Sequence, residues 1–334
     1  MVTRDACLAL PKVELHVHLE GSIRPETVLA LARKNGVALP ADTVDGLRDW
    51  YRFTNFAHFV EIYTTVSSCI RSAEDIEFVA REFLEGQREQ NIFHSEFTYT
   101  ALTQRTQSGI PLVEQMEALS SALDYARDTL GISAGVILDC TRESDVFEAR
   151  ELCELAVAWH GRGVVALGLS GFESVGAAFH HRETFAYARH MRLPIVPHAG
   201  ETQGAASIQE AVDLCEPPRI GHGVRVLEDD LLTDRLAKAG TVLEVCPSSN
   251  VCLGVAPALE AHPLPHLMER GLVVTINSDD PPMFGTTLTD EFHRCAQAFG
   301  WGLPTLERLC RTAAEAALIS EDERGVLLSR MGLS

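Results

Sequence analysis

The segment Pro11–Gly21, with the sequence PKVELHVHLEG, decides how the rest of the chain is interpreted. Hydrophobic and polar residues alternate from Val13 to Leu19, and this period of two is typical of a β-strand. His16 and His18 therefore project from one face. If the strand lines a barrel and ends near Leu19, both imidazoles lie at its C-terminal mouth and can share a metal ion. An isolated pair of this kind can equally be a hydrogen-bonded core feature, so the remaining sequence has to decide.

Composition limits the class of protein. The chain has 334 residues, of which 46% are hydrophobic, and this suits one large α/β barrel domain over residues 1–334. Its 47 acidic and 28 basic residues give a formal net charge of −19, which repels phosphate backbones and anionic membrane surfaces. We therefore expect no nucleic acid and no membrane among its partners.

The cysteines and the N-terminal segment indicate the compartment. Nine cysteines are scattered without the short spacing of a disulfide framework, which favours reduced core residues. Asp5, Lys12 and Glu14 place charges around a very short apolar run, and no stretch reaches the roughly 18 apolar residues of a membrane span. We expect a soluble, cytoplasmic protein without a signal peptide.

The start of the chain carries helix signals after the first strand. Pro25 and Gly36 bracket a predicted helix over residues 26–35. Aromatic residues then recur at near-helical spacing over residues 53–63, and a second helix is predicted at about residues 73–90. The aromatic interval is either a lid over the end of the first strand or an ordinary core stripe.

Strand and helix patterns alternate from there to the end. Strands are predicted at residues 92–100, 133–139, 164–170, 194–198, 219–222, 241–245 and 273–278. Helices are predicted at residues 112–129, 146–159, 183–190, 229–239 and 304–319. With the opening strand this makes about eight βα units, which predicts a (β/α)8 TIM barrel with a helical insertion after the first strand.

Residues with metal-binding or acid–base chemistry stand where four of these strands end. They are His16 and His18, His198 followed by Glu201, His222 between two glycines, and Asp279 with Asp280. Each has a plain explanation alone, as a strand cap, a turn or a helix start. Together they stand at the ends of barrel strands, where TIM-barrel enzymes carry their active sites. Three imidazoles and a carboxylate suit Zn²⁺ and leave one position for water.

Several other chemistries are disfavoured. Only three lysines are present, and none ends a middle strand, where a carboxylated lysine could bridge two metals. Cys246 and Cys252 are too far apart for the C-x-x-C of cytidine-type deaminases. The weak glycine pattern at residues 161–166 precedes a strand instead of following one, and no nucleophile elbow is found. We therefore expect a mononuclear site.

A set of motifs covers nearly the whole chain in order. They are HVHLEG at residues 16–21, HAGE at 198–201, GHG at 221–223, CPSSN at 246–250 and NSDDPP at 277–282. This set resembles the adenosine deaminase branch of the amidohydrolase superfamily. The resemblance implies a (β/α)8 barrel with one Zn²⁺ per chain, and the ligands it implies are His16, His18, His198 and Asp279.

The resemblance also implies a reaction, in which water attacks C6 of a 6-aminopurine and ammonia leaves. Glu201 would protonate N1 of the purine, and His222 would orient or deprotonate the water. Asp279 would help to activate that water beside the metal, because the family uses a strand-end carboxylate in this way. The substrate would be contacted by His18, Glu20, Asp280 at N7 and the backbone of Gly171 at N3.

The substrate is less specified than the chemistry. Adenosine deaminases proper usually carry Asp at the position of Glu20, where it meets a ribose hydroxyl, and an Arg-containing segment where residues 96–101 read EFTYTA. The branch also contains adenine deaminases and 6-aminodeoxyfutalosine deaminases of menaquinone synthesis, and Glu20 fits either. Adenine deaminases usually have Asp where this chain has Gly221, which favours a nucleoside. Residues 53–59 (FTNFAHF) and 200–204 (GETQG) look similar to the futalosine-pathway enzymes.

We therefore expect zinc-dependent deamination of an adenosine-like 6-aminopurine nucleoside, with 6-aminodeoxyfutalosine or adenine as alternative substrates. A second class of function is a catalytically silent barrel used for binding, which would lack a ligand or the acid. A third is a metallohydrolase acting on an amide or phosphoester, which usually needs a second metal. The sequence retains the whole ligand set and the acid, and it gives no indication of oligomeric state.

Overall fold

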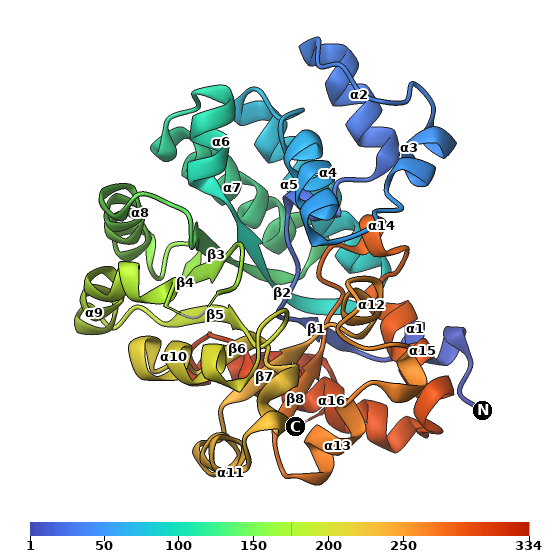
Figure 1. Ribbon diagram of the computed structural model, residues 1–334. Helices are drawn as coiled ribbons and strands as arrows, with labels where there is room; N and C mark the ends of the chain where they lie inside the picture. Colours follow the sequence, from blue (N-terminus) through green and yellow to red (C-terminus); the bar gives the residue numbers. More distant parts are fainter. Residues whose placement is uncertain (175, 334) are drawn as a thin grey trace.

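The structure is a computed structural model that describes residues 1–174 and 176–333. Its eight parallel strands follow one another around a barrel in the order of the sequence (Figure 1). The strands are β1 (Lys12–Glu14), β2 (Ile92–Tyr99), β3 (Ser133–Thr141), β4 (Val164–Ser170), β5 (Ile195–Ala199), β6 (Arg219–His222), β7 (Val242–Val245) and β8 (Val273–Ile276). The predicted (β/α)8 architecture is confirmed, and strands two to eight agree with the predicted ranges to within two residues at either end.

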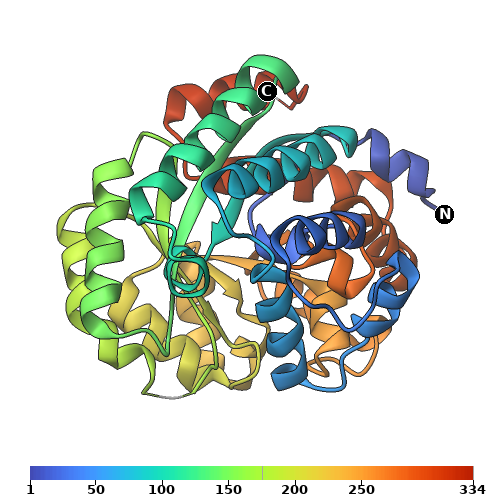
Figure 2. The same cartoon turned by 90° about the horizontal axis from the view of Figure 1, so that it is seen from above.

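Helices surround the strands (Figure 1). They are α1 (Arg4–Ala9), α2 (Pro25–Asn35), α3 (Val44–Trp50), α4 (Phe56–Ser67), α5 (Ala73–Glu89), α6 (Ala101–Ser108), α7 (Leu112–Tyr125), α8 (Val146–Trp159), α9 (Arg182–His190), α10 (Ala205–Cys215), α11 (Asp230–Ala239), α12 (Pro247–Cys252), α13 (Leu264–Glu269), α14 (Pro281–Phe284), α15 (Leu288–Phe299), α16 (Leu303–Ala316) and α17 (Glu321–Arg330). The end of the chain lies beside the segment after α7, where the Arg330 guanidinium donates to the carbonyl oxygen of Gly131 (Figure 2).

The first strand is shorter than predicted. Regular pairing in β1 ends at Glu14, because the backbone N–H groups of Leu15 and His16 donate to the side-chain oxygen of Asn277, at 3.0 and 3.1 Å, instead of to a neighbouring strand. Beyond them Val17 forms an isolated bridge with Asp279. The chain after β1 and the chain after β8 therefore hold this side of the barrel together, and both carry candidate metal ligands.

The predicted insertion after the first strand contains α2, α3, α4 and α5. In α4, Ile62 and Val66 are fully buried in the core. Phe56, Val60 and Tyr63, on the same helix, line a cavity at the end of the barrel. The helix in the aromatic interval therefore packs into the core and also lines the cavity, and its action as a lid stays a prediction.

Two expectations about the whole chain can be compared with the described residues. All nine cysteines are free, and all but Cys252 are buried. No helix in the described part of the chain is long and apolar enough to cross a membrane.

Candidate active site

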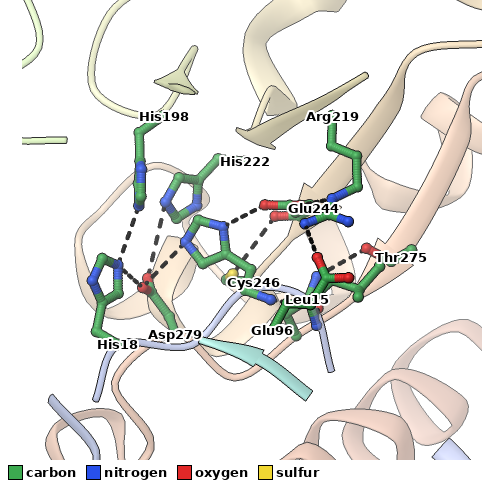
Figure 3. Close-up of polar contacts among 12 residues, drawn as sticks. Leu15, His18, Glu96, His198, Arg219, His222, Glu244, Cys246, Thr275 and Asp279 are labelled. Atoms are coloured by element: carbon green, nitrogen blue, oxygen red, sulfur yellow. Dashed lines mark hydrogen bonds and ion pairs between the residues drawn. The ribbon is translucent and has the colours of Figure 1, made fainter. Parts of the chain in front are cut away.

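The four predicted metal ligands come together at the C-terminal end of the barrel. His18, His198 and Asp279 are labelled in Figure 3 and point toward one another. His16 and His18 follow β1, His198 lies in β5 and Asp279 follows β8. One ligating atom from each of these side chains lies within 4.8 Å of the others. His18 Nε2 is 3.2 Å from His198 Nε2 and 3.3 Å from Asp279 Oδ1. The structure therefore assembles from three distant segments the set that the motifs implied.

The chemistry of these side chains fits a zinc ion. His16 Nε2 lies 3.5 Å from Asp279 Oδ1 and, like His198 Nδ1, is buried without a hydrogen-bond partner among the described residues. Buried imidazole nitrogens normally have a partner, and His16 Nε2, which faces the Asp279 carboxylate near two further imidazoles, is placed to bind a cation. Three histidines and one carboxylate are a ligand set that zinc accepts with one position open.

A series of buried charged residues hydrogen-bonds to the Nδ1 side of His16 and fixes the orientation of its ring. Glu244, on β7, accepts a hydrogen bond from His16 Nδ1 at 2.9 Å, which leaves Nε2 as the free ring nitrogen. Arg219 donates its Nε to Glu244 at 2.5 Å, and its Nη2 lies 2.6 Å from Glu96 on β2, the opposite strand of the barrel (Figure 3). The sequence analysis missed this series of residues, although charged residues inside otherwise apolar strands were a usable signal.

Two residues of the site have a backbone conformation that side chains rarely adopt. Asp279 has φ 64° and His222 has φ 62°, both in the left-handed region. Such a conformation costs about 1–2 kcal/mol for a non-glycine residue and is kept where the surroundings impose it. The Asp279 N–H donates to the His16 carbonyl at 3.1 Å, and the His18 N–H donates to the Asp279 carbonyl at 2.9 Å. These bonds fix the carboxylate beside the two histidines.

Two glycines allow side chains of the site to pack closely. A Cβ at Gly221 would lie 2.7 Å from His16 Cε1, and a Cβ at Gly21 would lie 1.6 Å from Asp280 Oδ1. Any larger residue would displace the ring or the carboxylate. Packing against His16 is thus a reason for Gly221 that does not depend on the substrate. The presence of glycine at this position is therefore weaker evidence for a nucleoside substrate.

The backbone around Glu201 is fixed by the side chain of Glu173. The Glu173 carboxylate accepts the N–H groups of Gly200 at 2.5 Å, Glu201 at 3.1 Å, Thr202 at 2.8 Å and Gln203 at 3.0 Å. Burial, reinforced by the negative charges of Asp279 and Glu173, raises the pKa of Glu201 to about 8. This raised pKa favours the protonated form of Glu201 near pH 7, which is the form that a proton donor needs.

These side chains open into one cavity of about 270 Å³. Its lining includes seven of the residues that the sequence singled out, namely His18, Gly171, His198, Glu201, His222, Asp279 and Asp280. Five apolar side chains also line it, namely Phe56, Phe59, Val60, Phe172 and Leu253. The first three lie in the aromatic interval that the sequence singled out, and the last two were missed. Tyr63 and Thr100 add hydroxyl groups to the lining.

Glu20 does not line this cavity. Its side chain is fully buried, and Oε1 accepts hydrogen bonds from the Thr100 N–H, at 3.0 Å, and from the Thr100 hydroxyl. Its Oε2 accepts the Tyr63 hydroxyl at 3.2 Å. The carboxylate therefore orients two cavity-lining residues instead of facing the cavity itself.

A second group of possible ligands shares Asp279 with the first and adds His222 and Cys246. Burial, together with the neighbouring acidic groups, raises the pKa of the Cys246 thiol well above its usual range. The thiol is also already engaged, since Cys246 Sγ donates to the Glu244 carbonyl oxygen at 3.6 Å. The three-histidine set is therefore the better candidate for zinc.

Comparison with known proteins gives a consistent result. The family model for adenosine deaminase matches residues 11–332. The chain is 38% identical over 324 residues to an adenine deaminase of Rhizobium leguminosarum, covering 97% of this chain and 99% of that protein. It is 36% identical over 311 residues to an adenine deaminase of Pseudomonas putida, covering 93% and 98%.

Two solved structures are similar along nearly the whole chain. An adenine deaminase from Arthrobacter aurescens superimposes with a TM-score of 0.91 at 30% identity, covering 97% of this chain and 98% of that one. An amidohydrolase from Burkholderia ambifaria, solved with bound Zn, superimposes with a TM-score of 0.91 at 24% identity, covering 99% and 93%, which supports the fold. The chain belongs to the adenosine deaminase family of the amidohydrolase superfamily, hydrolases that act on C–N bonds of cyclic amidines.

Proposed function

We propose that this protein is a zinc-dependent hydrolase that converts a 6-aminopurine nucleoside to its 6-oxo product and ammonia. The observation that carries the proposal is a single cavity in which a neutral carboxylic acid, Glu201, faces the histidines and aspartate of a zinc site. When bound at His16, His18, His198 and Asp279, zinc supplies Lewis-acid chemistry that brings the pKa of a water from 15.7 to about 7.

The side chains around the cavity supply the rest of the chemistry. Attack at C6 removes ring aromaticity and places negative charge on N1, so the Glu201 proton goes to N1 as the new C–O bond forms. The proton lost by the attacking water would go to the Asp279 carboxylate and then to the amino group, which leaves as ammonia when the C–N bond breaks. Asp280 lines the cavity, and burial and the adjacent Asp279 raise the pKa of its carboxyl well above the usual range. A protonated Asp280 can donate to N7, which is an acceptor, and the Gly171 N–H can donate to N3.

The proposal is tested with purified protein and a set of aminopurines. Adenine, adenosine, 2′-deoxyadenosine and 6-aminodeoxyfutalosine are followed by ultraviolet absorbance and ammonia release. At least one should be converted to its 6-oxo product with kcat/KM in the range of about 10⁴–10⁸ M⁻¹s⁻¹ that is usual for enzymes. No turnover of any of them by the zinc-loaded protein would contradict the proposal.

The extent of the cavity favours a nucleoside over a free base. Besides the residues proposed to contact the purine, the cavity is lined by the hydroxyl-bearing side chains of Tyr63, Thr100 and Thr103 and by aromatic residues of α4. The protons of the Tyr63 and Thr100 hydroxyls go to Glu20, so their oxygens remain as acceptors for the hydroxyl groups of a substituent at N9. Free adenine has no hydroxyl group to donate to them. 6-Aminodeoxyfutalosine belongs to the same class of N9-substituted aminopurine and would use the same groups.

Adenine is the second candidate. The adenine deaminases of Rhizobium leguminosarum and Pseudomonas putida cover nearly the whole chain at 38% and 36% identity. In addition, the oxygens of Glu20 are already occupied by Thr100 and Tyr63, so this carboxylate offers no free acceptor to a sugar hydroxyl. The kinetic comparison of free base with nucleosides separates the two candidates.

We expect about one zinc ion per chain, because the ligand set is three histidines and one aspartate. His16→Ala and His198→Ala should each lose both the metal and the activity, whereas His266→Ala, at an exposed histidine on α13, should keep both. Metal analysis together with turnover of the preferred aminopurine checks this. Two ions per chain, or an active variant without metal, would refute the site.

We expect activity to fall on the alkaline side of neutrality. Glu201 must carry its proton to act as the acid, and burial raises the pKa of this group to about 8. Raising the pH through that value removes the proton and with it the activity, whereas lowering the pH below it keeps the acid in its active form. The measurement is kcat/KM between pH 6 and 10, and a flat profile up to pH 10 would be inconsistent with this assignment.

A further inference from the structure

The ring of His222 is held by a line of buried groups that reaches from β6 to the start of α13. Asn250 Nδ2 lies 3.3 Å from His222 Nδ1. The oxygen of the same amide, Oδ1, lies 3.1 Å from His262 Nε2. His262 Nδ1 in turn receives the backbone N–H of Leu264 at 3.0 Å. His222, Asn250 and His262 are all at least nine-tenths buried.

The backbone group at the far end of this line fixes the direction of every hydrogen bond in it. A backbone N–H can only donate, so His262 Nδ1 must accept and carries no proton. His262 is then a neutral imidazole with its proton on Nε2, and burial, which lowers the pKa of His262 to about 4, supports this state. Its Nε2–H donates to Asn250 Oδ1, which turns the amide NH₂ of Asn250 toward His222.

The same reasoning then applies to His222. Because Asn250 donates to Nδ1, that nitrogen has no proton and the single ring proton of His222 is on Nε2. His222 Nε2 lies 3.6 Å from Glu201 Oε1 and 4.0 Å from Asp279 Oδ2. The Nε2–H therefore points into the region where the attacking oxygen and the purine C6 must meet.

We propose that Asn250 and His262 are positioning residues that hold His222 as the Nε2–H tautomer, so that His222 acts as a hydrogen-bond donor to the attacking oxygen and not as the base that deprotonates it. Sequence motifs left both roles of His222 open. The role given to His222 rests on the proposed deamination, but the tautomer and the two positioning residues do not, since they follow from hydrogen bonds within the protein.

The tautomer can be measured directly on the zinc-loaded protein. Nitrogen-15 NMR of histidine-labelled protein separates protonated from unprotonated ring nitrogens, and the His222 signals are assigned by their loss in His222→Gln. We expect Nε2 of His222 to be protonated and Nδ1 to be unprotonated. A proton on Nδ1 would overturn the proposal whatever the activity of the enzyme, and the result is independent of whether the right substrate has been found.

Two substitutions at His262 separate the proposed role from a purely structural one. His262→Asn keeps an acceptor near the position of Nδ1, and so the bond from Leu264, but loses the donor to Asn250. His262→Gln places a donor near the position of Nε2 and loses the acceptor for Leu264. If His262 acts through Asn250, His262→Asn lowers kcat by on the order of 10–100-fold with KM and zinc content unchanged, and His262→Gln is much less affected.

The opposite order, with His262→Gln impaired and His262→Asn close to the parent, would show that His262 only stabilises the start of α13. It would overturn the proposed action of His262 on His222 through Asn250. Asn250→Ala tests the intermediate step. It should lower kcat to a similar degree, and adding His262→Asn to it should cause no further loss, because both act on the same ring. Additive losses would contradict a single line of action. His266→Gln, on the exposed face of α13, serves as the matched control.

Discussion

Glu201→Gln is expected to lower kcat by on the order of 10²–10⁴-fold while the barrel and the zinc content stay unchanged. The amide matches the carboxylic acid in shape and can still hydrogen-bond N1 of the purine, but it cannot transfer a proton to it. The barrel should tolerate the change, because the hydrogen bonds that fix this segment run from backbone N–H groups to the Glu173 carboxylate and do not involve the Glu201 side chain.

The measurement is kcat beside zinc content and the thermal midpoint. Glu210→Gln, on α10 and outside the cavity lining, is the matched carboxylate-to-amide control and should behave like the parent. A Glu201→Gln protein with activity within about threefold of the parent would mean that another group protonates N1. Loss of zinc together with activity would instead place Glu201 among the residues that support the metal.

Much of the fold and of the metal site could be predicted because both depend on local sequence patterns. Parallel barrel strands are short apolar runs between helices, and every strand brings its C-terminal end to the same mouth. His16, His198 and Asp279 are far apart in sequence, but each stands at such an end, so knowing the alternation was enough to bring them together.

What could not be predicted depends on pairs of residues that meet only across the interior. β1 ends at Glu14 because of the side chain of Asn277, which lies at the other end of the sequence. Glu20 has the motif position of a substrate contact, yet Thr100 and Tyr63 occupy its oxygens. No local pattern reports such contacts, and only a buried polar residue in an apolar run hints that one exists.

The largest discrimination is expected between free adenine and purines substituted at N9. A site built to hydrogen-bond a hydroxyl can reject an analogue that lacks it by as much as about 10⁴-fold when its own polar groups are left unpaired, and by less when they keep partners within the protein. In this cavity the Tyr63 and Thr100 hydroxyls already donate to Glu20, so only their oxygens, together with the Thr103 hydroxyl, are available to a sugar. We therefore expect a higher kcat/KM for nucleosides than for adenine.

The Glu20→Asp variant tests whether the preference for nucleosides depends on the positions in which Glu20 holds Tyr63 and Thr100. The shorter carboxylate draws back from the Tyr63 hydroxyl and the Thr100 N–H that Glu20 now binds, so both lose their fixed positions. We expect kcat/KM for nucleosides to fall while that for adenine changes little, since adenine reaches only the purine contacts near Glu201, Asp280 and Gly171. The assay compares adenine, adenosine, 2′-deoxyadenosine and 6-aminodeoxyfutalosine in both proteins. If the parent prefers adenine, the protein is an adenine deaminase and the nucleoside proposal is wrong. A strong preference for 6-aminodeoxyfutalosine over adenosine would assign the protein to menaquinone synthesis, with the same chemistry at C6.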